Sequence, residues 1–342
     1  MNHHTETHTH YKQQLQRTFG ADLKQLSKVD SVKGLSNVAF DWIVIFLAMA
    51  SCFWLPHLLV YTLAAIVIAA RQHALLIIMH DASHYRLVAS KNLNDKLSNL
   101  FLAYPMLIRT ESYRKNHLAH HRHTNTAHDP DWIRKADNSD WEFPKTRTQL
   151  FAMLFRDLIG GGFIATLKAI YSLNEGGNTH NSSASPSSKL GLIVFWVVVF
   201  TVTALTGTWT CLLLWFIPAW TVLPVLLRVR SIAEHFGLDH THELNDSRNY
   251  HCNWLESTFL APHNVGYHLD HHLFPSVPFY NLPEFHSKLM TDDTYASLSH
   301  QSDGIFGSRR ASVERDIAPK KSPAKQLVPN RTLRNYAPVI RD

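Results

Sequence analysis

Two stretches of the chain, residues 42–70 and 190–227, contain no Asp, Glu, Lys or Arg. A helix needs about 20 mostly apolar residues to cross a bilayer, so each stretch is long enough for two crossings. Pro56 interrupts the helical hydrogen-bond ladder and predicts a turn within the first stretch. The Thr-Gly-Thr segment 206–208 predicts a turn within the second. These features predict an all-α integral membrane protein whose four transmembrane helices form two hairpins.

The rest of the sequence is divided around these hairpins. A polar N-terminal segment, residues 1–38, precedes a membrane domain at about residues 39–290. Residues 302–342 are polar, basic and poor in apolar side chains, so we expect them to form a disordered tail. The predicted spans of the membrane domain cover about residues 40–55, 58–79, 190–206 and 208–227.

The charges predict an orientation and exclude one class of partner. Lys and Arg lie outside both predicted hairpins, and the two turns carry none. Because these residues accumulate on the cytoplasmic side of membrane proteins, we expect both termini in the cytoplasm. The net charge of +6 fits contact with anionic lipid or an acidic redox partner. No nucleic-acid-binding motif accompanies this charge, so a nucleic-acid partner is not expected.

Three shorter segments connect these parts. Leu97–Ile108 is too short for a span and is expected to be re-entrant or interfacial. Leu150–Tyr171 mixes apolar and charged residues, which predicts an amphipathic helix at the lipid headgroups, with a buried globular helix as the alternative. The Gly/Ser/Asn-rich segment Asn174–Ser188 is expected to be a flexible linker.

Nine of the 24 histidines fall close to the ends of apolar runs, in three short clusters and one single position. Residues i, i+3 and i+4 share one face of a helix, so each cluster can present several imidazoles in one direction. Neutral imidazole binds iron, copper, zinc and nickel, so the pattern predicts a polynuclear metal site at a membrane surface. A solvated loop is preferred only for His3, His4, His8 and His10. The nine candidate ligands are His80, His84, His117, His120, His121, His235, His268, His271 and His272.

The number of histidines constrains the metal chemistry. Zinc normally takes four ligands, so eight or nine imidazoles fit two metal ions better than one. Copper is possible on ligand type, whereas oxidation of an unactivated C–H bond beside lipid favours iron and O2. Full reduction of O2 takes four electrons, of which desaturation of a substrate supplies two. The sequence shows no motif for an internal redox cofactor, so we expect a separate donor: a ferredoxin, rubredoxin, cytochrome b5 or reductase.

The histidine clusters resemble the three histidine boxes of the membrane fatty acid desaturase superfamily. The resemblance extends to Asp-Pro-Asp-Trp at 129–132, to Arg-Ser-Ile-Ala-Glu-His at 230–235, and to the segment 262–278 around the third box. It covers about residues 40–290. These flanks are most similar to the bacterial branch that includes dihydrorhizobitoxine desaturase-like proteins.

This resemblance implies four spans beneath a cytoplasmic helical cap, in which the nine histidines bind two iron ions. It implies O2 as co-substrate, a location in the bacterial inner membrane, and introduction of a C=C bond into a fatty acyl or acyl-like lipid chain. Acyl-CoA desaturases place an Asn four residues before the equivalent of His235, whereas this chain has Ser231, with Asn264 as a substitute candidate. The three-residue spacing from His80 to His84 also differs from that group and argues against a CoA thioester substrate.

Carboxylates near the histidines are candidate partners for the second ring nitrogen, which metal-bound histidines usually donate to a carboxylate or carbonyl. Asp81 and Asp270 rank first because they lie inside boxes, and Asp129, Asp131 and Glu234 follow; each could also be a surface carboxylate. The histidines not expected to be ligands are His123, His128, His240, His242, His251 and His263.

The sequence leaves several functions open. The same chemistry could serve a hydroxylase or ketolase of a carotenoid or similar lipid, or a desaturase of a small amino-acid-derived substrate. A membrane metal-binding or transport protein is disfavoured, because transport places ionisable residues inside the spans and the apolar stretches hold none. For a lipid substrate we expect a long, narrow pocket walled by Ala74–Met79 and Val222–Leu227.

Overall fold

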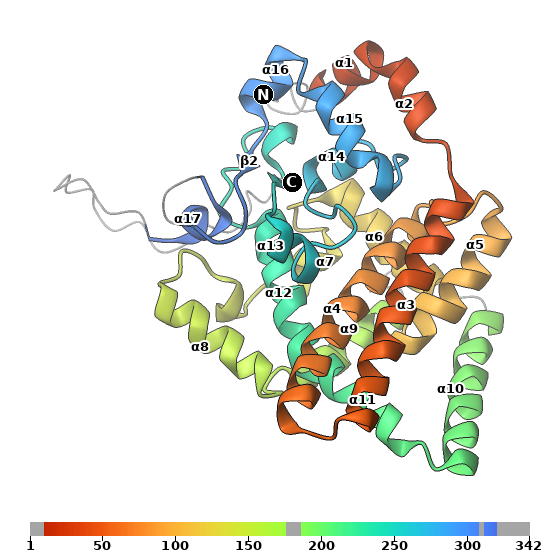
Figure 1. Ribbon diagram of the computed structural model, residues 1–342. Coiled ribbons are helices and arrows are strands. Elements are labelled where there is room, and N and C mark those ends of the chain that lie inside the picture. The colour runs from red at the N-terminus through yellow and green to blue at the C-terminus, as the bar shows by residue number, and fades with distance from the viewer. Residues whose placement is uncertain (1–9, 176–185, 308–310, 320–342) are drawn as a thin grey trace.

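The computed structural model describes residues 10–175, 186–307 and 311–319, and these residues are mostly helical (Figure 1). Within this part of the chain, four helical segments are long and apolar enough to cross a membrane, as predicted. The fourth of them is interrupted at Thr221 and consists of two helices. The helices concerned are α3 (Ser31–Trp54), α4 (Leu58–Ser83), α10 (Pro186–Thr206), α11 (Trp209–Trp220) and α12 (Val222–His235).

Both predicted turns are confirmed. Only residues 55–57 separate α3 from α4, and the Nδ1 atom of His57 accepts a hydrogen bond from the backbone N–H of Leu59, 3.2 Å away. Only residues 207 and 208 separate α10 from α11, and Gly207 has a φ of +70°, which favours glycine. Side chains of α10 are largely exposed, although its Trp196 indole donates to the backbone oxygen of Tyr104 at 2.9 Å.

A buried ion network joins α3 and α4 and was not predicted. Asp41 of α3 is fully buried and accepts from the Arg71 guanidinium of α4 at 3.1 Å. Its second oxygen lies 2.7 Å from Nε2 of His263. Asp41 and Arg71 directly flank the uncharged stretch 42–70, and the packing of α3 against α4 brings the two ends of that stretch together. The candidate spans α3 and α4 therefore contain charged residues. This finding weakens the case against a transport function, which relied on spans without ionisable residues.

The segment 97–108, expected to be re-entrant or interfacial, has an irregular helical backbone. The α-helix α5 (Lys91–Ser98) continues as a π-helical turn, η1 (Asn99–Ala103), and a 3-10 turn, η2 (Tyr104–Met106). Leu102 and Ala103 are fully buried in the same apolar core as α3 and α4.

The segment 150–171 differs from the single amphipathic helix that we expected. It consists of α8 (Arg147–Leu158) and α9 (Phe163–Glu175), which are bent by 75°. Three consecutive glycines, residues 160–162, separate the two helices, and Gly160 has a φ of +84°. Most of the linker expected at 174–188 lies outside the described residues.

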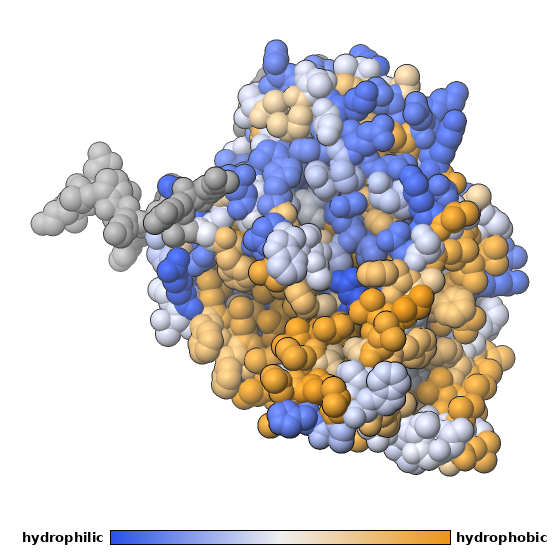
Figure 2. All heavy atoms as spheres, in the orientation of Figure 1, coloured by the Kyte–Doolittle hydropathy of each residue, from blue (hydrophilic) through white to orange (hydrophobic). Residues whose placement is uncertain are grey.

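The remaining elements form a polar helical cap above the apolar helices. Figure 2 shows hydrophobic residues gathered over α4 and α11 and hydrophilic residues over α1, α2, α15 and α16. The bounds of its helices are α1 (His10–Thr18), α2 (Gly20–Leu26), α6 (Thr110–His123), α7 (Pro130–Ile133), η3 (Ser139–Trp141), η4 (Glu243–Asn245), α13 (Trp254–Phe259), α14 (His268–Leu273), η5 (Phe279–Asn281), α15 (Leu282–Leu289), α16 (Asp293–Leu298) and α17 (Val313–Ile317). A two-stranded parallel sheet pairs β1 (Asn249–Tyr250) with β2 (Gln301–Ser302).

Both terminal segments contain helices. Within residues 10–38 lie α1, α2 and the start of α3, and Leu15 and Phe19 pack into a core with Leu269 and Phe285. Residues 302–307 and 311–319 belong to the ordered cap instead of a disordered tail. Apolar residues at i and i+4 explain this, because Val313 and Ile317 of α17 are buried together. The rest of the expected tail lies outside the described residues.

Candidate metal centre

Five of the predicted histidines form one group, cluster A: His80, His84, His117, His121 and His271. They come from α4 and its C-terminal end, from α6 and from α14. One ring nitrogen of each lies within 4.8 Å of the others. The Nε2 atom of His117 is 2.9 Å from those of His84 and His121, and His121 Nε2 is 3.1 Å from His271 Nε2.

The other four form cluster B: His120, His235, His268 and His272. They come from α6, α12 and α14. Ring nitrogens of His120, His235 and His272 lie within 4.8 Å of one another. The Nε2 atom of His268 is 3.0 Å from those of both His235 and His272. All nine predicted histidines, including the single His235, therefore gather in two adjoining groups.

Helix geometry explains how one box contributes to both clusters. On α6, His117 and His121 are four residues apart and enter cluster A, whereas His120 enters cluster B. On α14, His268 and His272 are four residues apart and belong to cluster B, whereas His271 joins cluster A. Residues at i and i+4 differ by only about 40° around a helix, while i+3 and i+4 differ by about 100°. Each H-x-x-H-H sequence therefore supplies histidines to both cluster A and cluster B.

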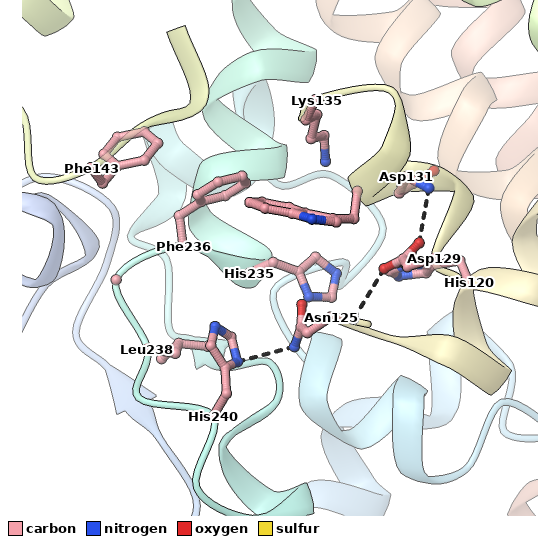
Figure 3. Close-up of a pocket in the computed structure, with 12 residues that line it drawn as sticks. His120, Asn125, Asp129, Asp131, Lys135, Phe143, His235, Phe236, Leu238 and His240 are labelled. Atoms are coloured by element: carbon pink, nitrogen blue, oxygen red, sulfur yellow. Dashed lines mark hydrogen bonds and ion pairs between the residues drawn. The ribbon is translucent and has the colours of Figure 1, made fainter. Parts of the chain in front are cut away.

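Two carboxylates contact the rear of the clusters. Both side-chain oxygens of Asp129 lie 2.9 Å from Nδ1 of His120 (Figure 3). Glu234 Oε1 lies 3.4 Å from Nδ1 of His268, which has no hydrogen-bond partner among the described residues. A carboxylate hydrogen-bonded as Asp129 is orients a ligating imidazole and raises its basicity.

The ranking that placed Asp81 and Asp270 first was wrong. Asp81 accepts from the backbone N–H of Phe279 at 2.7 Å, and its nearest oxygen is 3.8 Å from His80 Nδ1. Asp270 pairs with His286 at 2.8 Å instead of with a histidine of either cluster. Asp131 forms an ion pair with Arg134 three residues later on the chain.

The clusters are buried in a way that keeps the imidazoles neutral. Burial, followed by the neighbouring histidines, holds the pKa values of His117, His271 and His272 well below the ordinary value. Burial, with nearby Arg86 and Arg114, lowers the pKa of His84 to about 3. His120 is the exception: burial opposes its protonation, but the hydrogen bond to Asp129 and the charge of Asp131 raise its pKa.

This arrangement fits two divalent transition-metal ions. Metal binding requires deprotonated ring nitrogens, and the lowered pKa values provide them. The Nε2 atom of His80 is buried and has no hydrogen-bond partner among the described residues. A cation in cluster A would satisfy this lone pair. The donor set is all imidazole, which suits iron, copper or zinc on ligand type.

An apolar pocket of about 230 Å³ approaches cluster A, and one of its lining residues, Tyr113, contacts a histidine of that cluster. Both predicted walls contribute to it, through Leu76 and Met79 on one side and Leu223 and Leu227 on the other. Residues of α9 and the indole of Trp215 complete the lining. At its inner end, the ring of Tyr113 stacks on that of His117 with centroids 5.4 Å apart.

Comparison with known proteins identifies the family. The profile described as fatty acid desaturase matches residues 39–303. Dihydrorhizobitoxine desaturase from Bradyrhizobium elkanii is 30% identical over 83% of each chain. The sn-1 oleoyl-lipid 12-desaturase of Anabaena variabilis is 25% identical over 69% of each chain. The sn-1 acyl-lipid omega-3 desaturase (ferredoxin) of a Nostoc species is 25% identical over 61% of each chain.

The chain belongs to the fatty acid desaturase family. Its relatives make it an oxidoreductase of that family, and its four apolar helices fit an integral membrane protein.

In this desaturase-family chain, Ser231 stands where acyl-CoA desaturases have an Asn, and it contacts a residue that we did not predict. The Ser231 hydroxyl accepts from the Lys135 ammonium at 2.7 Å. Lys135 lines a small cavity of about 30 Å³ together with His120 and His235 (Figure 3). Asn264, the suggested substitute, donates to the backbone oxygen of Phe279 at 3.0 Å, and in neither cluster does it contribute a contact.

The histidines that were not expected to be ligands lie outside both clusters of this desaturase-family chain. His263 belongs to the network of Asp41, and His240 contacts the Asn125 side chain at 3.0 Å. His123 and His128 contact each other. His73, which the sequence analysis did not consider, is fully buried on α4, and both of its ring nitrogens lack a hydrogen-bond partner among the described residues.

Proposed function

We propose that this protein is a membrane-bound, O2-dependent desaturase that introduces a C=C bond into a fatty acyl or acyl-like chain. The observation that carries the proposal is that an apolar pocket approaches cluster A through Tyr113, whose ring lines the pocket and stacks on that of His117. The nine histidines of clusters A and B would hold two iron ions. Bound iron would supply the activation of O2 that oxidation of an unactivated C–H bond requires.

The chain's own residues would prepare this chemistry in three ways. Asp129 orients His120 and Glu234 approaches His268, so both act on cluster B. The apolar walls of the pocket exclude water from the substrate carbon next to cluster A. Burial of a hydrocarbon chain there contributes about 0.8 kcal/mol per CH₂ group. One relative is named a dihydrorhizobitoxine desaturase and another an sn-1 oleoyl-lipid 12-desaturase. As substrate of this chain we favour an acyl or acyl-like chain, because the pocket is apolar.

A separate electron donor completes the reaction. Desaturation removes two electrons and two protons from the substrate, the donor supplies two more electrons and the solvent two more protons, so that O2 is reduced to two molecules of water. The name of the Nostoc relative includes ferredoxin, which supports a ferredoxin-type donor for this chain. A rubredoxin, cytochrome b5 or reductase would supply the same electrons.

We further propose that α3 with α4, and α10 with α11 and α12, form two hairpins that begin and end on the cytoplasmic side of a bacterial inner membrane. The proposed membrane domain covers residues 39–290. The separation of apolar helices from a polar cap in Figure 2 supports embedding of the apolar helices in a membrane, and the Lys and Arg residues outside the two apolar stretches support the cytoplasmic orientation. Cysteines introduced near either terminus should react with a membrane-impermeant reagent only after the cytoplasmic side is exposed. Labelling from the opposite side in intact cells would overturn the topology.

Product analysis tests the activity itself. The full chain is expressed in a host of known lipid profile, and its lipids are analysed by mass spectrometry with and without O2. We expect a new double bond that depends on O2, and about two irons per chain by elemental analysis. A hydroxylated product without a double bond would assign the hydroxylase chemistry instead. One metal or none in a folded, active sample would overturn the two-iron centre.

A further inference from the structure

Two polar side chains lie at the inner end of the otherwise apolar pocket. Arg230 of α12 lines the pocket one helical turn before the histidine of that helix, and Tyr113 of α6 lines it beside His117. The rest of the lining is almost entirely Leu, Met, Ile, Trp, Phe, Ala and Pro. A ligand that fills the pocket as far as the metal centre must therefore meet a guanidinium and a phenol.

The guanidinium retains donors for such a ligand. Its Nε atom donates to Glu234 Oε1 at 2.6 Å. Within the described part of the chain, no other residue accepts a hydrogen bond from Arg230, although a guanidinium carries five N–H donors. The side chain of Arg230 is only 12% exposed, so the remaining donors can reach little bulk water.

The phenol of Tyr113 is a second donor at the same place. No described residue forms a hydrogen bond with its hydroxyl, because α6 directs the ring toward the pocket and onto His117. A phenol is protonated at neutral pH and can donate one hydrogen bond. Two unused donors, one of them cationic, therefore converge on the end of the pocket where substrate carbon would meet the metal centre.

We propose that Arg230 and Tyr113 bind a carboxyl or carbonyl oxygen of the substrate, close along its chain to the carbon that loses hydrogen. This proposal rests on the desaturase function above and narrows its substrate class. The substrate is a chain with an oxygen acceptor near the new double bond, not an uninterrupted hydrocarbon segment far from its headgroup. Filling this end of the pocket with hydrocarbon would leave buried donors unpaired, which disfavours such a substrate.

The competing explanation is that Arg230 is a positioning residue. Through Glu234 it could hold His268, whose Nδ1 atom is 3.4 Å from the carboxylate. In that case a change at Arg230 alters metal content and weakens all pocket ligands equally. If Arg230 contacts the substrate, the change removes the preference for an oxygen acceptor and leaves the affinity for plain hydrocarbon nearly unchanged.

Ligand binding to the full chain in lipid nanodiscs separates these explanations. Trp215 and Trp220 line the pocket and provide an intrinsic fluorescence signal. The probes are octanoate, methyl octanoate and n-nonane, which differ in charge and in the presence of a carbonyl oxygen. For the unaltered protein we expect at least one oxygen-bearing probe to bind about 10-fold or more tightly than the alkane. Octanoate alone would identify a carboxylate acceptor, and both probes would identify a carbonyl oxygen.

The variants are Arg230→Met, Tyr113→Phe and Arg230→Lys. Arg230→Met should reduce the preference to less than about threefold, and Tyr113→Phe should reduce it in part while metal content stays at the level of the unaltered protein. Arg230→Lys keeps a cation beside Glu234 and should retain part of the preference if Arg230→Met fails to fold. Leu223→Trp, which fills the pocket, should abolish binding of all three probes and is the control for partition into lipid.

Two outcomes overturn the proposal: equal affinity of the unaltered protein for all three probes, or an unchanged preference in both Arg230→Met and Tyr113→Phe. Double-bond formation is measured in parallel on the iron-loaded protein. A clear binding preference without any unsaturated product would refute the desaturase function while leaving the acceptor site in place. Unsaturated product without a binding preference would refute the acceptor site alone.

Discussion

Asp129→Asn is the substitution that tests most directly how the protein would hold the two proposed metal ions. The carboxylate is 2% exposed, and both of its oxygens lie 2.9 Å from Nδ1 of His120. It also accepts from the backbone N–H of Asp131 at 2.8 Å and so begins α7. Asparagine keeps the size and one acceptor oxygen of the side chain, so α7 can still be capped. The negative charge that orients His120 is lost.

The size of the effect follows from this single contact. A hydrogen bond to a charged group contributes about 1.5–3 kcal/mol, which corresponds to about 10- to 150-fold in an equilibrium constant. Loss of a carboxylate behind a metal-bound histidine typically costs about 10- to 100-fold in metal affinity. His120 belongs to cluster B, so we expect the metal of cluster B to be lost about 10- to 100-fold more readily, while cluster A keeps its own.

A chelator titration followed by elemental analysis measures this. The unaltered protein should lose its two metals at similar chelator concentrations, whereas Asp129→Asn should release one equivalent at a lower concentration. Asp157→Asn is the matched control, because Asp157 is equally buried, is ion-paired with Arg228 and contacts no histidine of either cluster among the described residues. Unchanged release from Asp129→Asn, or an equal loss in both variants, would refute the assigned role of this carboxylate.

Three further substitutions test the site and the packing around it. His271→Ala should abolish product formation while membrane insertion stays normal by fractionation, and retention of more than about a tenth of the activity would contradict its place in cluster A. Asp41→Asn removes one partner of a buried ion pair, which costs about 3–5 kcal/mol, so the thermal unfolding midpoint in detergent should fall clearly; an unchanged midpoint would contradict the network. Gly34→Ala should lower the same midpoint because its Cβ would collide with the Leu87 backbone oxygen, whereas Gly20→Ala, with open space around it, should not; equal midpoints would show that α3 can shift freely.

The spans and the candidate ligands could be read from the sequence because each depends on local spacing. A run without charges predicts a membrane helix, and Pro56 marks its turn. The i, i+3, i+4 pattern places imidazoles on one side of α6 before any tertiary contact is known. What the pattern could not predict is that His120 and His121 diverge to different clusters, because that depends on where α12 and α4 lie relative to α6.

The carboxylates were harder to predict because their contacts depend on chain reversal and helix direction. Asp270 lies inside a box, yet the α14 backbone turns it away toward His286 and Tyr295. Asp129 is nine residues from His120 and reaches it only because the chain reverses after α6. The sequence did contain one unused signal: Asp41 and Arg71 are each 15 residues from the turn at Pro56, so a hairpin must bring them to the same level.

Cluster A contains five histidines and cluster B four. This difference predicts which of the two proposed metal ions is held less firmly. Helix α6 contributes two imidazoles to cluster A and one to cluster B, whereas α14 contributes one to cluster A and two to cluster B. The difference comes from their neighbours, because α4 adds two histidines to cluster A, whereas α12 adds only His235 to cluster B. Both carboxylate contacts, from Asp129 and Glu234, fall on cluster B, and so does the cavity lined by Lys135. Cluster B therefore depends more on surrounding groups than cluster A does, and substitutions around it should affect metal retention first.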